Sequence, residues 1–264
     1  MLVVKALLSY HWGFSVRKPF FSAQQPAFRV PPPTTLIGSL ARAFASARGW
    51  PETFESNGGL FSSAARLCRA CPWATAAIVD ENVLPSVGPV ETRDVMRAVI
   101  AHYLRRENVE PGAVMFAPQP HGKVYAPGFK LLAAFLFTDE GEAREASRLA
   151  WSICAVGCKE SLVSVEDVRL LSLERVRNRL VETRFYFEKA LAREGPAAGF
   201  IEEDMTMPSA EHYQVARVKV DVETCIVPLG PVRVEVVEGK ALVLKDEEGD
   251  YYIVGRNRVG GLGA

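Results

Sequence analysis

The segment that decides the fold of the N-terminal half is Phe28-Arg29-Val30-Pro31-Pro32-Pro33-Thr34-Thr35-Leu36-Ile37-Gly38-Ser39-Leu40-Ala41-Arg42-Ala43-Phe44. Its three prolines favour extended backbone, since each ring restricts φ and disfavours the helical region for the preceding residue. A helix is then expected to begin with Thr34 or Thr35 as its N-cap. Apolar residues recur on one face of this helix: Leu36, Ile37, Leu40, Ala41 and Phe44.

Two further expectations attach to this helix. Gly38 lies in its middle, where glycine costs about 1 kcal/mol relative to alanine, which predicts close packing against a strand. The exposed N–H groups at a helix start can hold a phosphate, because the helix dipole adds positive potential there. A ligand at this point is therefore expected to be anionic.

Length and composition indicate a globular chain. Its 264 residues, 48% of them hydrophobic, are enough for a substantial core in one large domain or two smaller ones. No apolar run is long enough to span a bilayer. The first residues, Met1 to Leu8, lack the basic region of a signal peptide and resemble a buried strand, so a cytoplasmic location is expected.

The charges balance overall but are unevenly distributed. A net charge of zero argues against a protein that coats nucleic acid indiscriminately. No acidic residue precedes Glu52, whereas six lysines and arginines do. This asymmetry indicates either one basic surface on a neutral body or an ordinary solvated face.

Sequence motifs exclude several classes of enzyme. The chain has no Walker phosphate loop, dinucleotide fingerprint, His-Glu-x-x-His helix or Gly-x-Ser-x-Gly elbow, so ATPase, dehydrogenase and common hydrolase functions lack support. The five cysteines form Cys68-x-x-Cys71, Cys154-x-x-x-Cys158 and a lone Cys225. Structural zinc and a disulfide are alternatives to plain free thiols, which cytosolic frequencies favour. We expect no metal and no cofactor.

The order of predicted elements indicates an α+β fold of the ferredoxin-like βαββαβ class, with one strand unassigned. Asp139 and Glu142 form a capping box for a helix that is expected to stop at Gly157. The other elements that carry this prediction are strands at Leu2–Leu8, Ala74–Val79, Phe129–Phe137 and Ser161–Leu171, and a helix within Ser62–Trp73.

Two regions extend this unit. Prolines and glycines punctuate residues 85–128, which are expected to project from the body and to contain an amphipathic helix at Thr92–Arg106. After residue 172 the chain becomes β-rich, with alternating valines at 218–222 and 232–236 and further strands at 241–244 and 251–254. The expected domains are residues 1–172, with a thumb at about 85–128, and residues 173–264.

The connection from Ser9 to Ala27 interleaves aromatic rings with cations and contains no acid. Such a composition suits single-stranded nucleic acid, because bases stack on rings while lysine and arginine follow the phosphates. The alternative is a loop whose rings fold back onto the core.

These residues carry a resemblance to a known family. The turn Tyr10-His11-Trp12-Gly13 and, above all, Pro31-Pro32-Pro33-Thr34-Thr35-Leu36-Ile37-Gly38-Ser39-Leu40 resemble the N-terminus of the fifth CRISPR-associated protein family. Gly157-Cys158-Lys159-Glu160-Ser161 is similar to a second stretch of that family, with Cys158 in place of an arginine. The resemblance covers most of the chain; in the C-terminal third it rests on general character.

The resemblance implies a RAMP subunit of a type I Cascade antiviral complex, with subtype I-A suggested by length and style. It implies an RRM-like, ferredoxin-like palm, a thumb inserted before the second long strand and a smaller β-rich C-terminal region. It also implies binding of the CRISPR RNA 5′ handle, contacts with the backbone RAMP subunit and the large subunit, and indirect contact with target DNA. On this basis the expected RNA-binding residues are His11, Trp12, Arg17, Lys18, Arg29, Thr34, Thr35, Arg93, Arg97 and Lys123.

Two other functions stay open at this point. Some members of the family cut precursor CRISPR RNA without metal, using tyrosine, lysine and histidine. Here His121, Lys123 and Tyr125 would share one side of an extended segment, and Tyr10, His11 and Lys18 offer a second set. The other possibility is an interaction scaffold with incidental RNA contact, which a large apolar fraction permits.

Overall fold

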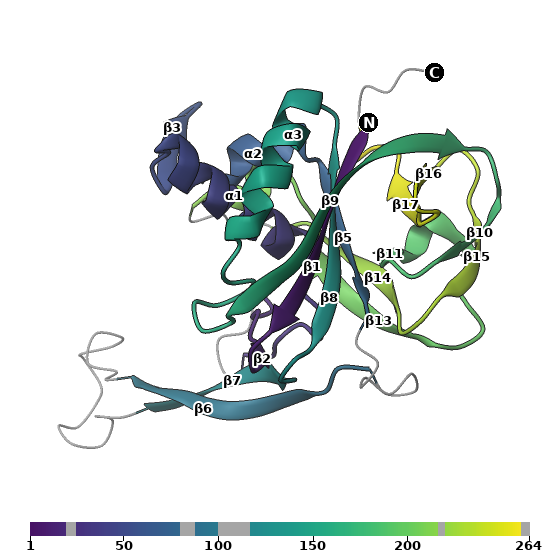
Figure 1. Cartoon of the computed structure of the whole chain (residues 1–264). Helices are drawn as coiled ribbons and strands as arrows, with labels where there is room; N and C mark the ends of the chain where they lie inside the picture. Colours follow the sequence, from purple (N-terminus) through teal and green to yellow (C-terminus); the bar gives the residue numbers. More distant parts are fainter. Residues whose placement is uncertain (20–24, 80–87, 100–116, 216–219, 260–264) are drawn as a thin grey trace.

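The structure is a computed structural model that describes residues 1–19, 25–79, 88–99, 117–215 and 220–259 (Figure 1). Its centre is a six-stranded sheet with the order β17-β16-β9-β1-β8-β5, in which every pair is antiparallel. The strands are β1 (Leu2–Tyr10), β5 (Trp73–Ile78), β8 (Lys130–Phe137), β9 (Val163–Val176), β16 (Ala241–Asp246) and β17 (Tyr251–Gly255). The strands expected from apolar runs in the N-terminal two thirds are confirmed.

The central sheet joins residues from both sides of the division expected after residue 172. Strand β9 runs through that point, and β16 pairs with its last residues in the register Val243↔Val176 to Asp246↔Leu173. The division into residues 1–172 and 173–264 remains a prediction about folding units.

Three helices lie together on one side of the central sheet (Figure 1): α1 (Pro33–Arg48), α2 (Ala64–Ala70) and α3 (Glu140–Leu149). The predicted apolar face of α1 is confirmed, since Leu36, Ile37, Leu40, Ala41 and Phe44 are all buried. The expectation for Gly38 is wrong, because a Cβ there would have no atom within 4 Å.

The capping box of α3 is confirmed, but its predicted end is wrong. The Asp139 carboxylate accepts a hydrogen bond of 2.8 Å from the backbone N–H of Glu142. The α-helix ends at Leu149 and continues only as the short 3₁₀ turn η1 (Ala150–Ser152), well before Gly157. The tertiary reason is that the chain after η1 pairs with the residues that lead into β9: the Val156 N–H donates to the Ser161 carbonyl and the Val163 N–H to the Cys154 carbonyl, both at 3.0 Å.

The predicted insertion contains a β-hairpin that projects from the body (Figure 1). Strands β6 (Glu91–Val99) and β7 (Ala117–Tyr125) pair with each other, and β7 also pairs with β2 (Gly13–Phe14). The expected helix at Thr92–Arg106 is therefore wrong over residues 92–99, and residues 100–106 lie outside the described residues. Pairing with β7 overrides a local pattern that also fits a helix.

The remaining strands build smaller sheets. Two three-stranded sheets have the orders β10-β15-β12 and β11-β14-β13, and β3 and β4 form a hairpin. These elements are β3 (Thr53–Ser56), β4 (Gly59–Ser62), β10 (Leu180–Thr183), β11 (Phe187–Glu188), η2 (Lys189–Leu191), β12 (Ala192–Glu194), β13 (Phe200–Thr206), η3 (Glu211–Tyr213), β14 (Val222–Pro228) and β15 (Val232–Val236). The expected valine strand at 232–236 is confirmed, whereas residues 218 and 219 of the other valine pattern lie outside the described residues. Within the described ranges, no helix has the length and apolar character that crossing a membrane requires.

Candidate nucleic-acid interface

The turn after β1 presents His11 and Trp12 at the surface. Strand alternation places Tyr10 inside, where it is 1% exposed and donates a hydrogen bond of 3.3 Å to the Val156 carbonyl. Gly13 follows with φ +127°, and a Cβ there would collide with the carbonyl oxygen of Val124 in β7. Glycine thus allows the chain to turn sharply and to pair with β7 as β2.

The Gly157–Ser161 loop lies directly against this turn. The Ser15 N–H donates to the Ser161 hydroxyl at 3.0 Å, and the Cys158 N–H donates to the Ser15 carbonyl at 2.9 Å. The Trp12 indole N–H donates to the Glu160 carbonyl. Two stretches that are about 150 residues apart in the sequence therefore form one surface, together with His11, whose Nε2 lies 2.9 Å from the Ser164 hydroxyl.

Two aromatic rings and one cation form the centre of this surface, here called the Trp12 platform: Trp12, Lys123 and Tyr125. The Trp12 and Tyr125 ring centroids lie 5.6 Å apart. The Lys123 ammonium lies 5.8 Å from the Trp12 ring and 5.3 Å from the Tyr125 ring, and it donates a hydrogen bond of 3.0 Å to the Tyr125 hydroxyl. Tyr125 is 50% exposed. Such a surface can stack a base and place a cation near its phosphate.

The local electrostatics keep a carboxylate ionised beside the platform. A hydrogen bond from the Cys158 thiol lowers the pKa of the exposed Glu160 carboxyl, and the positive charges of Lys159 and Lys123 act in the same direction. The platform therefore combines Lys123 with one nearby acid.

Lys18 and Arg29, both predicted to bind RNA, share a buried carboxylate instead of facing solvent freely. The Arg29 guanidinium lies 3.0 Å from Oε2 of Glu203, and the Lys18 ammonium pairs with Oε1 of the same residue. The Glu203 side chain is 1% exposed, while those of Lys18 and Arg29 are 27% and 33% exposed. These two cations tie the chain at residues 18 and 29 to β13. Arg17 is exposed and donates to the Gln25 side-chain oxygen at 2.8 Å.

The start of α1 differs from the prediction. Pro32 occupies the N-cap position without a side-chain hydrogen bond, so the expected threonine cap is wrong. The Thr34 hydroxyl shares a hydrogen bond of 2.5 Å with Thr206, and Thr34 is only 5% exposed. The Thr35 N–H donates to the Pro32 carbonyl at 3.0 Å. Because this helix start packs against β13, its geometry offers no support for the expected phosphate contact of Thr34, and Thr35 is half-buried.

The remaining predicted residues lie on the projecting hairpin. Arg93 is exposed on β6, opposite Gly122 of β7. Arg97 lies on β6 opposite Gln119, and its side chain lies outside the described residues. Of these three predicted hairpin residues, Lys123 belongs to the Trp12 platform and contacts the turn after β1.

The residues weighed as catalysts differ strongly in exposure. His121 is 7% exposed and lies under the 25–27 segment, forming a backbone bridge with Gln25, whereas Tyr125 is half exposed. In the second set, burial raises the pKa of Tyr10 well above its usual range, and Lys18 is paired with Glu203. In each set, therefore, at least one of the three side chains is buried.

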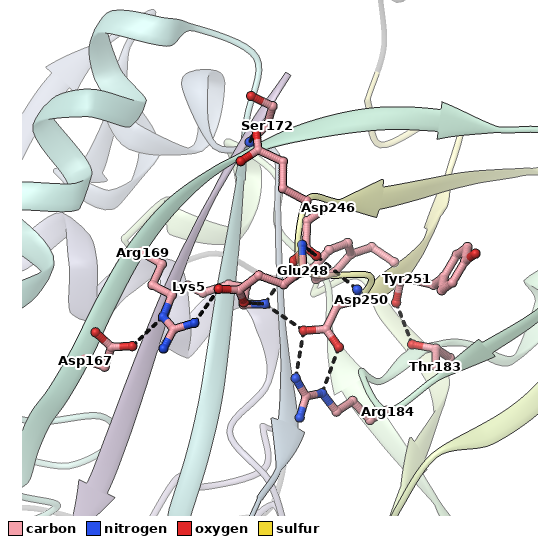
Figure 2. A network of polar contacts seen from close by, with 12 residues as sticks. Lys5, Asp167, Arg169, Ser172, Thr183, Arg184, Asp246, Glu248, Asp250 and Tyr251 are labelled. Carbon is pink, nitrogen blue, oxygen red and sulfur yellow. Dashed lines mark hydrogen bonds and ion pairs between the residues drawn. The ribbon is translucent and has the colours of Figure 1, made fainter.

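A lysine side chain lies among the carboxylates that most resemble a metal site (Figure 2). Among the described residues, the carboxylate groups of Asp246, Glu248 and Asp250 come within 4.8 Å of one another. The Lys5 ammonium lies 3.0, 2.5 and 2.7 Å from these three carboxylates, and Figure 2 shows it pointing into their midst. The five cysteines are free thiols in the structure. This network was missed by sequence reasoning, although a lone lysine in the apolar strand β1 was a signal for it.

Sequence reasoning also missed the role of Tyr125 and of the Glu160 carbonyl as neighbours of Trp12. No local pattern could have found them, because three separate segments meet there.

Comparisons with known proteins identify relatives of the chain. No family model matches it. A Saccharolobus solfataricus protein named CRISPR system aCascade subunit Cas5 1 is 38% identical over 187 residues, which cover 71% of this chain and 72% of the relative. CRISPR-associated protein Cas5 3 of the same organism is 36% identical over the same shares of both chains.

A solved structure agrees with the fold. The crystal structure of a CRISPR protein from Archaeoglobus fulgidus matches with a TM-score of 0.63 and 19% identity, covering 96% of this chain and 99% of that one. Identity this low supports the fold alone, whereas the two Saccharolobus relatives match most of the sequence. The chain therefore belongs to the Cas5 family of CRISPR-associated proteins.

Proposed function

We propose that the chain is a non-catalytic subunit of a type I Cascade complex that binds the 5′ handle of CRISPR RNA and helps the complex to assemble. The observation that carries this proposal is the Trp12 platform, where two rings and the Lys123 ammonium meet beside the Gly157–Ser161 loop. The name of one relative, a subunit of a Cascade system, supports membership in such a complex.

The platform suits unstacked bases of a single strand. A base inserted against Trp12 or Tyr125 gains stacking energy, and the neighbouring lysine neutralises a phosphate. Arg93 on β6 and Arg17 before the 25–27 segment are further exposed cations of this part of the chain. The indole hydrogen bond to the Glu160 carbonyl fixes the ring orientation, so little side-chain entropy is lost on binding.

The architecture supports the finer parts of the proposal. The strand order β9-β1-β8-β5, with α1 and α3 on one side, fits a ferredoxin-like palm, and the β6–β7 hairpin fits a thumb. The proposal has two further parts. It assigns the chain to subtype I-A and to the cytoplasm, and it includes contacts with the backbone RAMP subunit, with the large subunit and, indirectly, with target DNA.

The deciding experiment measures binding and cleavage of a labelled CRISPR repeat RNA in EDTA over a salt series. Trp12→Ala is expected to weaken binding about 5- to 150-fold, which corresponds to about 1–3 kcal/mol for one stacked base. Trp12→Phe keeps a ring and should retain most of the affinity. Trp151→Ala is the matched control, because Trp151 on η1 is exposed, at 54%, and is not one of the platform residues.

Three outcomes would contradict the proposal. Equal affinity of Trp12→Ala and Trp151→Ala would remove the platform from the binding site. Cleavage in EDTA that His121→Ala abolishes would instead favour a metal-independent endoribonuclease. If the chain assembled with other subunits but bound no RNA, either alone or in the complex, the scaffold function would be favoured.

A further inference from the structure

A pocket lined by arginines, here called the arginine pocket, lies at the end of β9 that is far from the Trp12 platform. Its volume is about 320 Å³. Its walls are the chain that leaves β9 at 175–179, the turn between β15 and β16, the start of β16 and the residue that follows β17. Four arginines line it: Arg175, Arg177, Arg179 and Arg256.

The arginine pocket carries more positive than negative charge. Arg179 pairs with Glu238, the one carboxylate residue among the described residues that line the pocket. Arg175 and Arg177 make no ion pair with the described part of the chain, and both are exposed. Arg256 is exposed too, and its Nε donates only a long hydrogen bond of 3.3 Å to the Ala241 carbonyl.

A larger cavity shows that this excess is not a general property of the surface. About 550 Å³ of space lies beside Lys5, bordered by Lys130, Arg169 and Arg184. Each of these four cations is paired with at least one carboxylate (Figure 2 draws Lys5, Arg169 and Arg184). The cations of that cavity are therefore neutralised by neighbouring carboxylates. In the arginine pocket, by contrast, three guanidinium groups have no carboxylate partner in the described ranges of the chain.

The sheet holds one of these arginines, Arg175, in place. Strand pairing opposes Arg175 to Leu244 and Val176 to Val243. The apolar lining of the pocket is buried, with Val236, Leu242 and Val243 between 4% and 7% exposed. An apolar wall strengthens charge interactions above it, and guanidinium groups bind phosphate oxygens in a two-pronged geometry.

We propose that the arginine pocket binds the phosphate backbone of a nucleic-acid strand. Ser164, beside the Trp12 platform, and Arg175 lie on the same strand 11 residues apart, so about 36 Å separates the two sites. Figure 1 shows β9 running from the region of the hairpin to the C-terminal strands. This second site goes beyond handle binding. Because phosphate contacts carry no sequence information, it accepts RNA or DNA of any sequence.

The test uses the full chain and unrelated oligonucleotides that lack the repeat: single-stranded RNA, single-stranded DNA and duplex DNA. Affinities are measured across about 50–200 mM salt, where counterion release dominates. In the triple variant Arg175→Gln/Arg177→Gln/Arg256→Gln, the slope of log affinity against log salt for a single strand should become shallower by about 2.

The matched control removes three arginines that already have acidic partners. Arg144, Arg193 and Arg233 pair with Glu140, Glu235 and Glu182 on exposed surfaces. The triple variant Arg144→Gln/Arg193→Gln/Arg233→Gln has the same net charge as the pocket variant and should keep the wild-type slope. Comparing the three oligonucleotides then identifies which nucleic acid the pocket prefers.

Several results would overturn the inference without touching handle binding. Equal slope changes in the two triple variants would show an effect of net charge alone. Wild-type failure to bind unrelated strands at low salt, with repeat RNA still bound through Trp12, would leave only the handle site. If the pocket variant bound nucleic acid as the wild type does but lost its co-purifying subunits, the pocket would be assigned to a protein partner.

Discussion

Gly13 sets the position of the Trp12 platform through backbone conformation. Its φ of +127° lies in a region that side-chain-bearing residues rarely adopt, and the Val124 carbonyl occupies the space of a Cβ. The residue therefore allows β2 to approach β7, which brings Trp12 next to Lys123 and Tyr125.

Gly13→Ala should destabilise the chain by about 2 kcal/mol or more, because backbone strain and the clash with β7 add. Gly38→Ala is the matched control. Gly38 lies mid-helix with open space at its Cβ, so alanine should raise the free energy of unfolding by about 0.5–1 kcal/mol. Urea unfolding of both variants measures the two changes. A neutral Gly13→Ala would show that the turn relaxes freely.

At the scale of elements, Lys5 fastens β1 to the turn between β16 and β17. The lysine is 3% exposed and bonded to three carboxylates of that turn, while Arg184 binds Asp250 through two hydrogen bonds of 3.0 and 2.8 Å. The Tyr252 hydroxyl donates to Asp246 at 2.7 Å. The C-terminal hairpin, which pairs with β9 in the sheet, is thus joined to the first strand by charge.

Lys5→Met should lower the free energy of unfolding by about 3–5 kcal/mol, since it keeps the side-chain volume but leaves the buried Asp246 carboxylate without a cation. Lys130→Met is the control, because Lys130 pairs with Glu166 at 2.9 Å on an exposed surface. Its cost should stay within about 1 kcal/mol. Equal effects of the two substitutions in chemical denaturation would contradict a special role for Lys5.

The same network determines how stability depends on pH. Burial alone would raise the pKa of Asp250, but hydrogen bonds from Arg184 and Lys5 outweigh it and lower the pKa; a hydrogen bond from Lys5 also lowers the pKa of Glu248. Their stabilisation is present above the unfolded values of 3.8 and 4.5 and is lost as pH falls through the lower folded values.

At alkaline pH, the network loses stabilisation as the pH rises rather than as it falls. Burial alone would lower the pKa of Lys5, yet its hydrogen bonds to Asp250, Glu248 and Asp246 raise it above 10.5. Its stabilisation is complete below 10.5 and disappears as pH rises through the folded value. The free energy of unfolding, measured from acid to alkaline pH, should therefore show a plateau and decrease at both ends of the pH range. In Lys5→Met, the decrease at acidic pH should be smaller.

At the scale of the whole molecule, the number of cysteine thiols that react with a reagent measures whether the core is intact. Burial raises the pKa of Cys68 to about 11 and raises the pKa of Cys71 and Cys225 well above the usual range. Cys154 is exposed and Cys158 is half-buried. Since thiolates react and buried thiols do not, a disulfide reagent at about pH 8 should modify two thiols in the native chain and all five in denaturant. Rapid reaction of all five without denaturant would contradict the packing described.

Local sequence predicted much of the fold but little of the candidate site. The apolar stripe of α1 and the Asp139 cap were confirmed because their interactions lie within a few residues. The threonine cap of α1 was wrong because Thr206, 172 residues away, takes the Thr34 hydroxyl. Strand β6 was taken for a helix because its partner β7 lies beyond residue 116.

The sequence by itself determined which segments are strands or helices in the central sheet, and it indicated the Cas5 family through two short motifs. The tertiary structure decided which charges face solvent and which are neutralised. Glu203 pairs with Lys18 and Arg29, while Arg175, Arg177 and Arg256 line one pocket and form no ion pair with the described part of the chain. The physical reason is that periodicity and capping act between neighbours along the chain, whereas ion pairs and ring contacts depend on distance in space.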